Sequence, residues 1–134
     1  MNNISTALLF LFPGITFYPG GDCLLQDDGA GPYIAQWNRP EPQPTPAEIA
    51  AAELPAAKAA AIAKNRAECS SRIYARYPAG RQLSALAGIY DAANVRAMHD
   101  WIAANVAAEN TAADAIEAAQ SVAAVEAVTV AWPV

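Results

Sequence analysis

"QDDGAGPYIAQWNRPEPQPTPAEI", from Gln26 to Ile49, is the stretch of sequence that decides the fold. It contains, in order, a glycine-rich turn, an apolar segment, a run of alternating prolines and a helix start. Turn residues between apolar segments favour a β-hairpin, whereas a capping pattern favours a helix. The stretch therefore predicts a passage from β-structure to helical structure within one short span.

The first half of the stretch predicts a β-hairpin. Asp27–Gly31 has the aspartates and glycines that suit turns and left-handed backbone positions. In the segment that follows, Pro32–Trp37, side chains alternate with the period of a strand, and both faces carry apolar groups. Asp22–Gln26 supplies the partner strand. A strand that is apolar on both faces needs cover on both sides.

The second half predicts a stiff connector followed by a helix. Proline occupies every second position within Arg39–Thr45, and each proline lacks an N–H and disfavours helix in the residue before it. Thr45 and Glu48 form a capping-box pattern, with Pro46 at the first helical position. A helix should therefore begin at Pro46, and Pro55 should kink or break it.

On the N-terminal side, a short helix is expected before the hairpin. Asn3 or Ser5 suits its cap, and a proline-glycine pair after Phe12 ends it. The next segment, Ile15–Tyr18, is rich in β-branched and aromatic residues and predicts a further strand.

On the C-terminal side, the spacing of apolar residues predicts two long helices that pair as an antiparallel hairpin. The first follows Pro55, carries an exposed Glu68–Arg72 pair and ends near Tyr77; a shorter helix over Arg81–Ala87 follows. The second begins near Asp91. The apolar face of the first long helix carries Ile62, Cys69, Ile73 and Tyr77. That of the second carries Val95, Met98, Ile102, Val106, Ala113 and Ile116.

The end of the chain is ambiguous between helix and strand. Asn110 and Thr111 are positions where the last long helix could break, and Ser121 suits the cap of a final short turn. Valines after Ser121 fit both a helical and an alternating spacing. A short helix followed by an extended tail is the favoured interpretation.

These elements predict an α+β fold in three parts. Residues 1–38 form a small module with a helix and the β-hairpin, residues 39–45 form a proline-rich linker, and residues 46–134 form an alanine-rich helical region. A chain of 134 residues allows only a modest buried core.

Charge and hydropathy exclude some classes of partner. The net charge of −5 argues against nucleic-acid binding, which needs a clustered positive surface. Basic residues do concentrate between Lys58 and Arg81, where they face solvent and acidic residues or form a patch for an anionic partner. The apolar run near the N-terminus, about nine residues long, is shorter than a membrane span and follows no basic residue, so we expect neither a membrane segment nor a signal peptide.

No constellation of residues predicts catalysis, a cofactor or a metal. Cys23 and Cys69 have no zinc-type spacing and are expected to be reduced packing residues. His99 lies next to Asp100 on a helix, where neighbouring side chains diverge. The turn resembles a calcium or phosphate loop in composition only, because it lacks a downstream ligand and no helix follows it. We therefore expect a non-enzymatic protein.

The first forty residues carry more apolar side chains than so small a module can bury. Such an excess indicates a protein interface, unless the helical region folds back and covers it. The candidate partner-binding residues are Phe17, Tyr18, Tyr33, Ile34 and Trp37.

The ordered pattern of this region resembles the XkdW-like tail proteins of bacteriophages. The resemblance covers about Ala7 to Glu53, and the residues that carry it are Asp28, Gly29, Gly31, Tyr33, Ile34, Trp37, Asn38, Pro44, Thr45 and Glu48. The C-terminal part, with "SRIYARYPAGRQLSALAGIY", resembles in pattern the tail-fibre assembly chaperones and accessory proteins of phages.

The resemblance implies a tail component that binds a tail-fibre or baseplate protein within a hetero-oligomer. It would act as a fibre assembly chaperone or accessory subunit; the alternative is a permanent structural subunit of the virion. The implied locations are the host cytoplasm during assembly and the virion tail.

Overall fold

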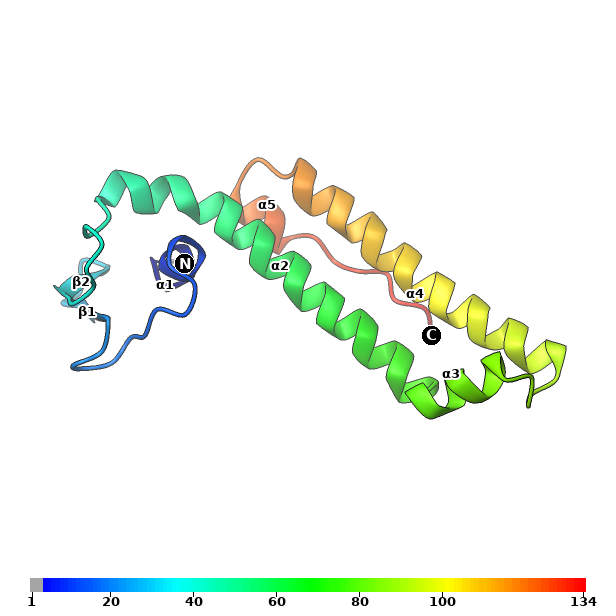
Figure 1. Cartoon of the computed structure of the whole chain (residues 1–134). Helices are drawn as coiled ribbons and strands as arrows, with labels where there is room; N and C mark the ends of the chain where they lie inside the picture. Colours follow the sequence, from blue (N-terminus) through cyan, green and yellow to red (C-terminus); the bar gives the residue numbers. More distant parts are fainter. Residues whose placement is uncertain (1–3) are drawn as a thin grey trace. The chain divides into compact units, whose positions relative to one another are not determined.

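The computed structural model describes residues 4–134, which form five helices and two strands (Figure 1). The elements are α1 (Ile4–Leu11), β1 (Cys23–Asp27), β2 (Pro32–Trp37), α2 (Pro46–Arg76), α3 (Ala79–Leu86), α4 (Ala92–Ala118) and α5 (Val122–Glu126). This is the expected α+β class. The predicted cap at Asn3 lies outside the described residues, and α1 spans the expected helix. Ser5, the other predicted cap, is wrong, because it lies inside α1.

The contacts divide the chain into two compact units, Met1–Ala60 and Ala61–Val134. The division lies inside α2, so the first turns of this helix belong to unit 1 and its remainder to unit 2. The three-part organisation with boundaries at residues 38 and 45 stays a prediction.

The hairpin forms where the sequence predicts it. β1 and β2 pair antiparallel from Cys23 with Trp37 to Asp27 with Pro32, with a bulge between the second and third pairs. In the turn, Gly29 and Gly31 have φ angles of 103° and 107°, which only glycine adopts readily. The aspartates contribute differently from the prediction, since no described residue other than glycine has a positive φ. Instead, the Asp27 carboxylate accepts the backbone N–H groups of both glycines, at 2.8 and 3.2 Å.

The predicted strand at Ile15–Tyr18 is wrong. Thr16 and Asp22 close a loop: the Thr16 N–H donates to the Asp22 carboxylate at 3.1 Å, and the Asp22 N–H donates to the Thr16 hydroxyl at 2.9 Å. Side chains thus satisfy backbone groups that a ladder would otherwise bind. Gly21 is needed here, because a Cβ atom would lie 2.8 Å from the Thr16 hydroxyl oxygen.

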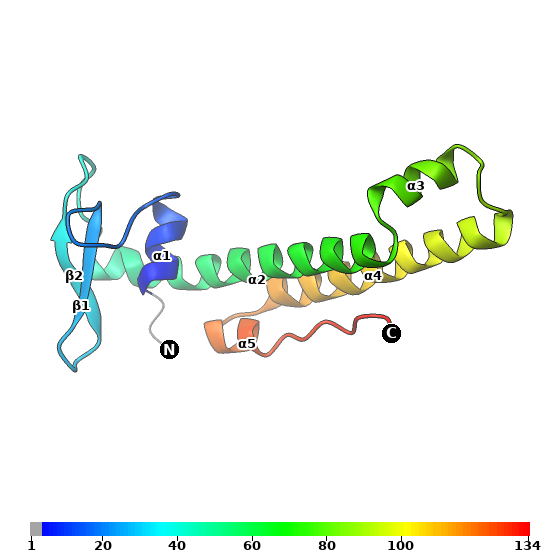
Figure 2. The ribbon, with the colours of Figure 1, turned by 90° about the horizontal axis from the view of Figure 1, so that it is seen from below.

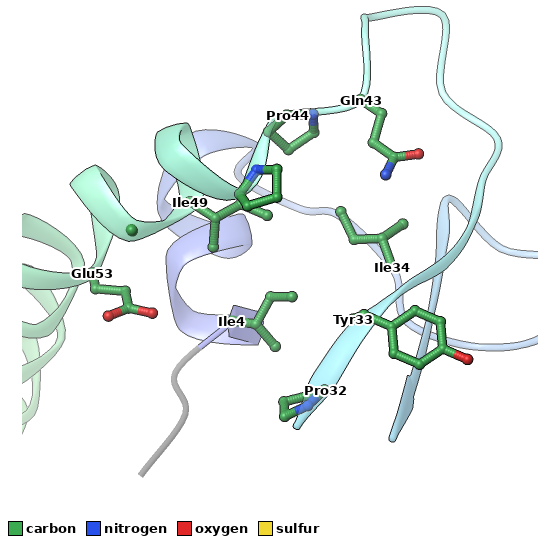
Figure 3. Close-up of a pocket in the computed structure, with 10 residues that line it drawn as sticks. Ile4, Pro32, Tyr33, Ile34, Gln43, Pro44, Ile49 and Glu53 are labelled. Atoms are coloured by element: carbon green, nitrogen blue, oxygen red, sulfur yellow. The ribbon is translucent and has the colours of Figure 1, made fainter. Parts of the chain in front are cut away.

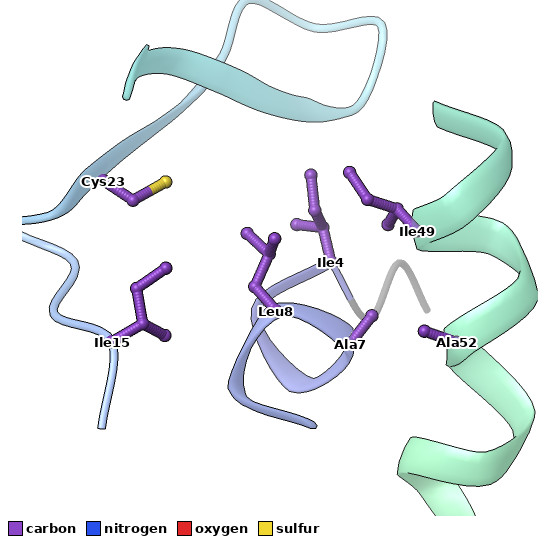
Figure 4. Close-up of a cluster of buried hydrophobic side chains, with 7 residues drawn as sticks. All are labelled: Ile4, Ala7, Leu8, Ile15, Cys23, Ile49 and Ala52. Atoms are coloured by element: carbon purple, nitrogen blue, oxygen red, sulfur yellow. The ribbon is translucent and has the colours of Figure 1, made fainter. Parts of the chain in front are cut away.

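The core of unit 1 brings together segments from four parts of its sequence (Figure 4). Leu8 of α1 is fully buried at its centre, against Ile15 of the loop, Cys23 of β1 and Ile49 of α2. Ala7 and Ala52 are small enough to let the two helices approach closely. The full buried set is Ile4, Ala7, Leu8, Ile15, Cys23, Ile49 and Ala52.

The start of α2 confirms the capping-box prediction. The Thr45 N–H donates to the Glu48 carboxylate at 2.7 Å, and the Glu48 N–H donates to the Thr45 hydroxyl at 3.2 Å. Pro55 does not break the helix, which continues to Arg76. Ala52 and Ala56, on either side of Pro55, are buried, and their packing offsets the single hydrogen bond that proline removes.

In unit 2, the later part of α2 and α4 run antiparallel, as Figures 1 and 2 both show. Arg66 pairs with Glu109 at 3.6 Å, and further along α2 Arg72 donates to the Asn105 side chain at 2.9 Å. The helix passes unbroken through Asn110 and Thr111, whose hydroxyl donates back to the Ala107 carbonyl.

The apolar face predicted for α4 is partly wrong. Asn105 is fully buried, whereas the next residue, Val106, is 39% exposed. The inward positions follow a seven-residue spacing, which is typical of paired helices. They are Val95, Met98, Ile102, Asn105, Glu109, Ala112, Ile116 and Ala119.

The turns of unit 2 use recognisable local signals. α3 ends at a glycine with φ of 77°, Gly88, and the Ile89 N–H donates back to the Ser84 carbonyl, the Schellman pattern. The side chain of Asp91 accepts from the Asn94 N–H and caps α4. Ser121 caps α5 in the same way, and the predicted extended tail follows.

The C-terminal tail is held by Arg72. Its guanidinium donates to the carbonyl of Pro133 and lies 5.7 Å from the centre of the Trp101 ring and 5.4 Å from that of Trp132. This inward position corrects the predicted surface pair with Glu68, because the guanidinium binds the tail and Asn105 instead. One side chain therefore links α2, α4 and the tail.

Replacing Arg72 by alanine should lower the free energy of unfolding of unit 2 by about 2 kcal/mol, because a charged donor and its ring contacts are lost. Urea unfolding monitored by tryptophan fluorescence measures the change. Arg96→Ala, on the exposed surface of α4, is the matched control and should change stability by less than about 0.5 kcal/mol. Equal effects of the two substitutions would contradict the role given to Arg72.

Candidate partner-binding site

The five predicted partner-binding residues lie in two kinds of environment in unit 1. Tyr18 and Tyr33 are 57% and 42% exposed. Phe17, Ile34 and Trp37 are half buried and pack against the core. Only the two tyrosines are exposed, so they are the members of the set best placed to contact a partner.

Trp37 fastens the proline-rich connector to the module. Its indole N–H donates to the carbonyl of Glu41 at 2.7 Å, and its ring meets that of Phe12 edge-on at a centroid distance of 5.2 Å. The Arg39 guanidinium lies 5.3 Å from the centre of the same Phe12 ring and pairs with Glu41 at 2.8 Å. This pairing lowers the pKa of Glu41. The connector thus leaves β2 in a defined direction.

Tyr33 is oriented by hydrogen bonds within the hairpin. Its hydroxyl donates to the Asp28 carboxylate at 2.6 Å, and the Gln26 amide donates to the other oxygen of that carboxylate at 2.8 Å. Bonds to the ionised form lower the pKa of Asp28, the Tyr33 bond most, and the same bond raises the pKa of Tyr33. The ring is therefore fixed before any partner binds.

A groove of about 300 Å³ lies between the hairpin and the start of α2 (Figure 3). Tyr33 and Ile34 border it on the side of β2, and Ile49 and Glu53 border it on the side of α2. Its lining is mostly apolar. The lining residues are Ile4, Pro32, Tyr33, Ile34, Gln43, Pro44, Pro46, Ile49, Ala50 and Glu53.

Further exposed apolar residues lie outside the predicted set. On α1, Leu9, Phe10 and Leu11 are each more than a third exposed. The signal in the sequence is the uninterrupted apolar run from Ala7 to Leu11, which leaves the last turns of α1 without a polar side chain. In unit 2, Leu83, Leu86 and Ile89 are exposed around the end of α3, and the two leucines share one face of this helix; their spacing was the available signal.

The cysteines are buried and reduced. Burial is the largest cause that raises the pKa of both thiols; the neighbouring Asp22 adds to it at Cys23, and Glu109 adds to it at Cys69. Among residues 4–134, no group of three or more histidine, cysteine or acidic side chains is placed to hold a metal ion. No helix in this part of the chain is long and apolar enough to cross a membrane.

Most of unit 1 matches a known protein family. Residues 4–61 match the model of the XkdW protein family, a phage-associated family. This part of the chain, the XkdW segment below, is similar to that family. The match confirms the resemblance expected from the hairpin and connector, and it extends through the first turns of α2.

The XkdW segment ends where unit 2 begins, since the match stops at residue 61 and the first unit at Ala60. No match supports the resemblance expected for the C-terminal part. No curated protein and no solved structure is similar enough to the chain to count as a match. The comparisons therefore relate residues 4–61 to a phage-associated family.

Replacing Tyr33 by phenylalanine should raise the pKa of the Asp28 carboxyl towards its ordinary value, because the larger of its two hydrogen bonds is lost. Because the pKa of Asp28 is lowered in the folded state, its carboxylate stabilises the hairpin at pH values above its ordinary pKa. This contribution disappears as the pH falls through the folded-state pKa. NMR titration of the Asp28 side chain, in the native protein and in the variant, measures both pKa values. Tyr74→Phe is the control. An unchanged Asp28 titration would mean that the Tyr33 bond does not exist in solution.

Proposed function

We propose that this protein is a non-enzymatic component of a bacteriophage tail that binds a tail-fibre or baseplate protein. The observation that carries the proposal is the exposed apolar surface of the XkdW segment, comprising Leu9, Phe10, Leu11, Tyr18 and Tyr33. Exposed apolar groups gathered on one small module are typical of a protein interface. The phage-associated family supports the choice of partner.

Within this proposal the protein acts as a fibre assembly chaperone or an accessory subunit of the fibre. The partner is another protein and not nucleic acid, in keeping with the net charge of −5. Assembly takes place in the host cytoplasm, and an accessory subunit then remains in the virion tail. The second candidate is a permanent structural subunit without a chaperone role.

Tyr18 and Tyr33 are the residues to test, since both are exposed and neither belongs to the buried core. Co-expression of the chain with the fibre and baseplate proteins of the same phage should give a complex on size-exclusion chromatography. Replacing both tyrosines by alanine should weaken it by about 2 kcal/mol or more, which is roughly thirty-fold in Kd. Tyr74→Ala, an equally exposed tyrosine of unit 2, should leave the complex unchanged.

Absence of a complex with every fibre and baseplate protein would contradict the proposed function. Trp37→Ala is a poorer test, because Trp37 binds Glu41 and Phe12 and its loss disturbs the fold. Quantitative mass spectrometry of purified virions separates the two candidates. A permanent subunit is present in fixed stoichiometry, whereas a chaperone is absent or substoichiometric.

A further inference from the structure

The groove of unit 1 follows the edge of a strand rather than its face. Three consecutive residues of β2 line it, Pro32, Tyr33 and Ile34. Side chains of consecutive strand residues point to opposite faces of a sheet. A cavity that touches all three therefore borders the edge of β2, where backbone groups lie between the two faces.

This edge of β2 has no strand beside it in the described part of the chain, where the sheet consists of β1 and β2 alone. Natural proteins usually protect such edges with a proline, a charge or a covering segment, because unpaired N–H and C=O groups can bind another strand. In β2 the only proline is Pro32, the first residue, and the strand contains no charged side chain.

The hydrogen-bond pattern identifies which backbone groups face the groove. The Cys23 N–H donates to the Thr16 carbonyl at 3.1 Å, which lies away from β2, so the pair of Cys23 with Trp37 is a non-bonded pair. Bonded and non-bonded pairs alternate in an antiparallel ladder. The bulge adds Ala35 to β2 and no residue to β1, so the alternation holds along β1, and Leu25, two residues after Cys23, is again non-bonded and faces Ile34. The N–H and C=O of Ile34 therefore point to the outer edge.

The opposite wall of the groove is suited to an extended peptide. Pro44 and Pro46 have no N–H to compete for the backbone of a ligand, and Ile49 offers an apolar surface. Glu53, a half-buried residue, adds a carboxylate, and no ion pair to it is present among residues 4–134. A basic side chain of a ligand would complement this charge.

We propose that this groove binds an extended segment of a partner protein as an added strand on β2. The segment has apolar side chains at alternate positions and a lysine or arginine that reaches Glu53. Backbone bonds to Ile34 provide affinity, and the apolar wall and the carboxylate select the sequence. The inference rests on the proposed function only for the identity of the partner.

The first test uses a displayed library of random twelve-residue peptides, selected against the full chain. Enriched peptides should share alternating apolar residues and a basic residue. A synthetic peptide of the enriched sequence should slow amide hydrogen exchange at Ile34 at least ten-fold. Failure to enrich any peptide, or enriched peptides that leave exchange at Ile34 unchanged, would overturn the inference.

The second test blocks the groove. Ala50→Trp fills it from α2 and should weaken binding of the same peptide at least ten-fold, whereas Ala51→Trp, on the exposed surface one residue along, should have no effect. Glu53→Gln should weaken binding several-fold, with Glu68→Gln as its control. Equal binding to the Ala50→Trp and Ala51→Trp variants overturns the inference. So does a concentration-dependent dimer that the Ala50→Trp substitution abolishes, which would make a second copy the occupant.

The two proposals fail in different ways. If the Ala50→Trp variant captures a fibre or baseplate protein as well as the native protein does, the groove is not the docking site. The proposed function then still stands. Peptide binding in the groove without capture of any tail protein supports strand addition and contradicts the proposed function.

Discussion

Burial of Leu8 is the interaction on which the structure of the XkdW segment depends. Its side chain meets residues from the loop, from β1 and from α2, segments that have few other means of staying together. A two-stranded hairpin is marginal alone in water, and a helix gains most of its stability in proteins from packing an apolar face. Each element of unit 1 is therefore stable because the others bury it.

The candidate site is a consequence of this arrangement. Ile34 and Trp37 contribute to the core, and Trp37 also fastens the connector. The prolines and Ile49 lie across from the free edge of β2. The exposed aromatic surface remains because so small a module cannot bury every apolar residue that it carries. The same small set of apolar side chains thus supplies both the core and the binding surface.

Local signals made much of the fold predictable from the sequence. The capping box at Thr45, the cap at Ser121 and the turn glycines determine the backbone within a few residues, and the structure confirms them. The wrong predictions depended on distant contacts. Ile15 has strand-like chemistry but lies in a loop that Asp22 closes, and Pro55 lies in a helix that packing keeps continuous.

The candidate site was predictable in composition and not in geometry. The sequence indicated aromatic residues in excess, but the half-buried state of Trp37 depends on how the connector folds back, and the orientation of Tyr33 depends on its bond to Asp28. In unit 2, burial of Asn105 instead of Val106 depends on the partner helix and on Arg72, which no spacing rule identifies. The sequence did not predict the unpaired edge of β2, because the backbone groups that face outward follow from the register of the hairpin.

Native-state hydrogen exchange of the Leu8→Ala variant tests this account most directly. The substitution should cost about 3 kcal/mol, and slowly exchanging amides of the hairpin and of the first turns of α2 should all lose protection together. Amides of α4 should keep theirs, because they belong to unit 2. Loss of protection confined to α1, with the hairpin and the start of α2 unchanged, would contradict the claim that Leu8 holds the module together.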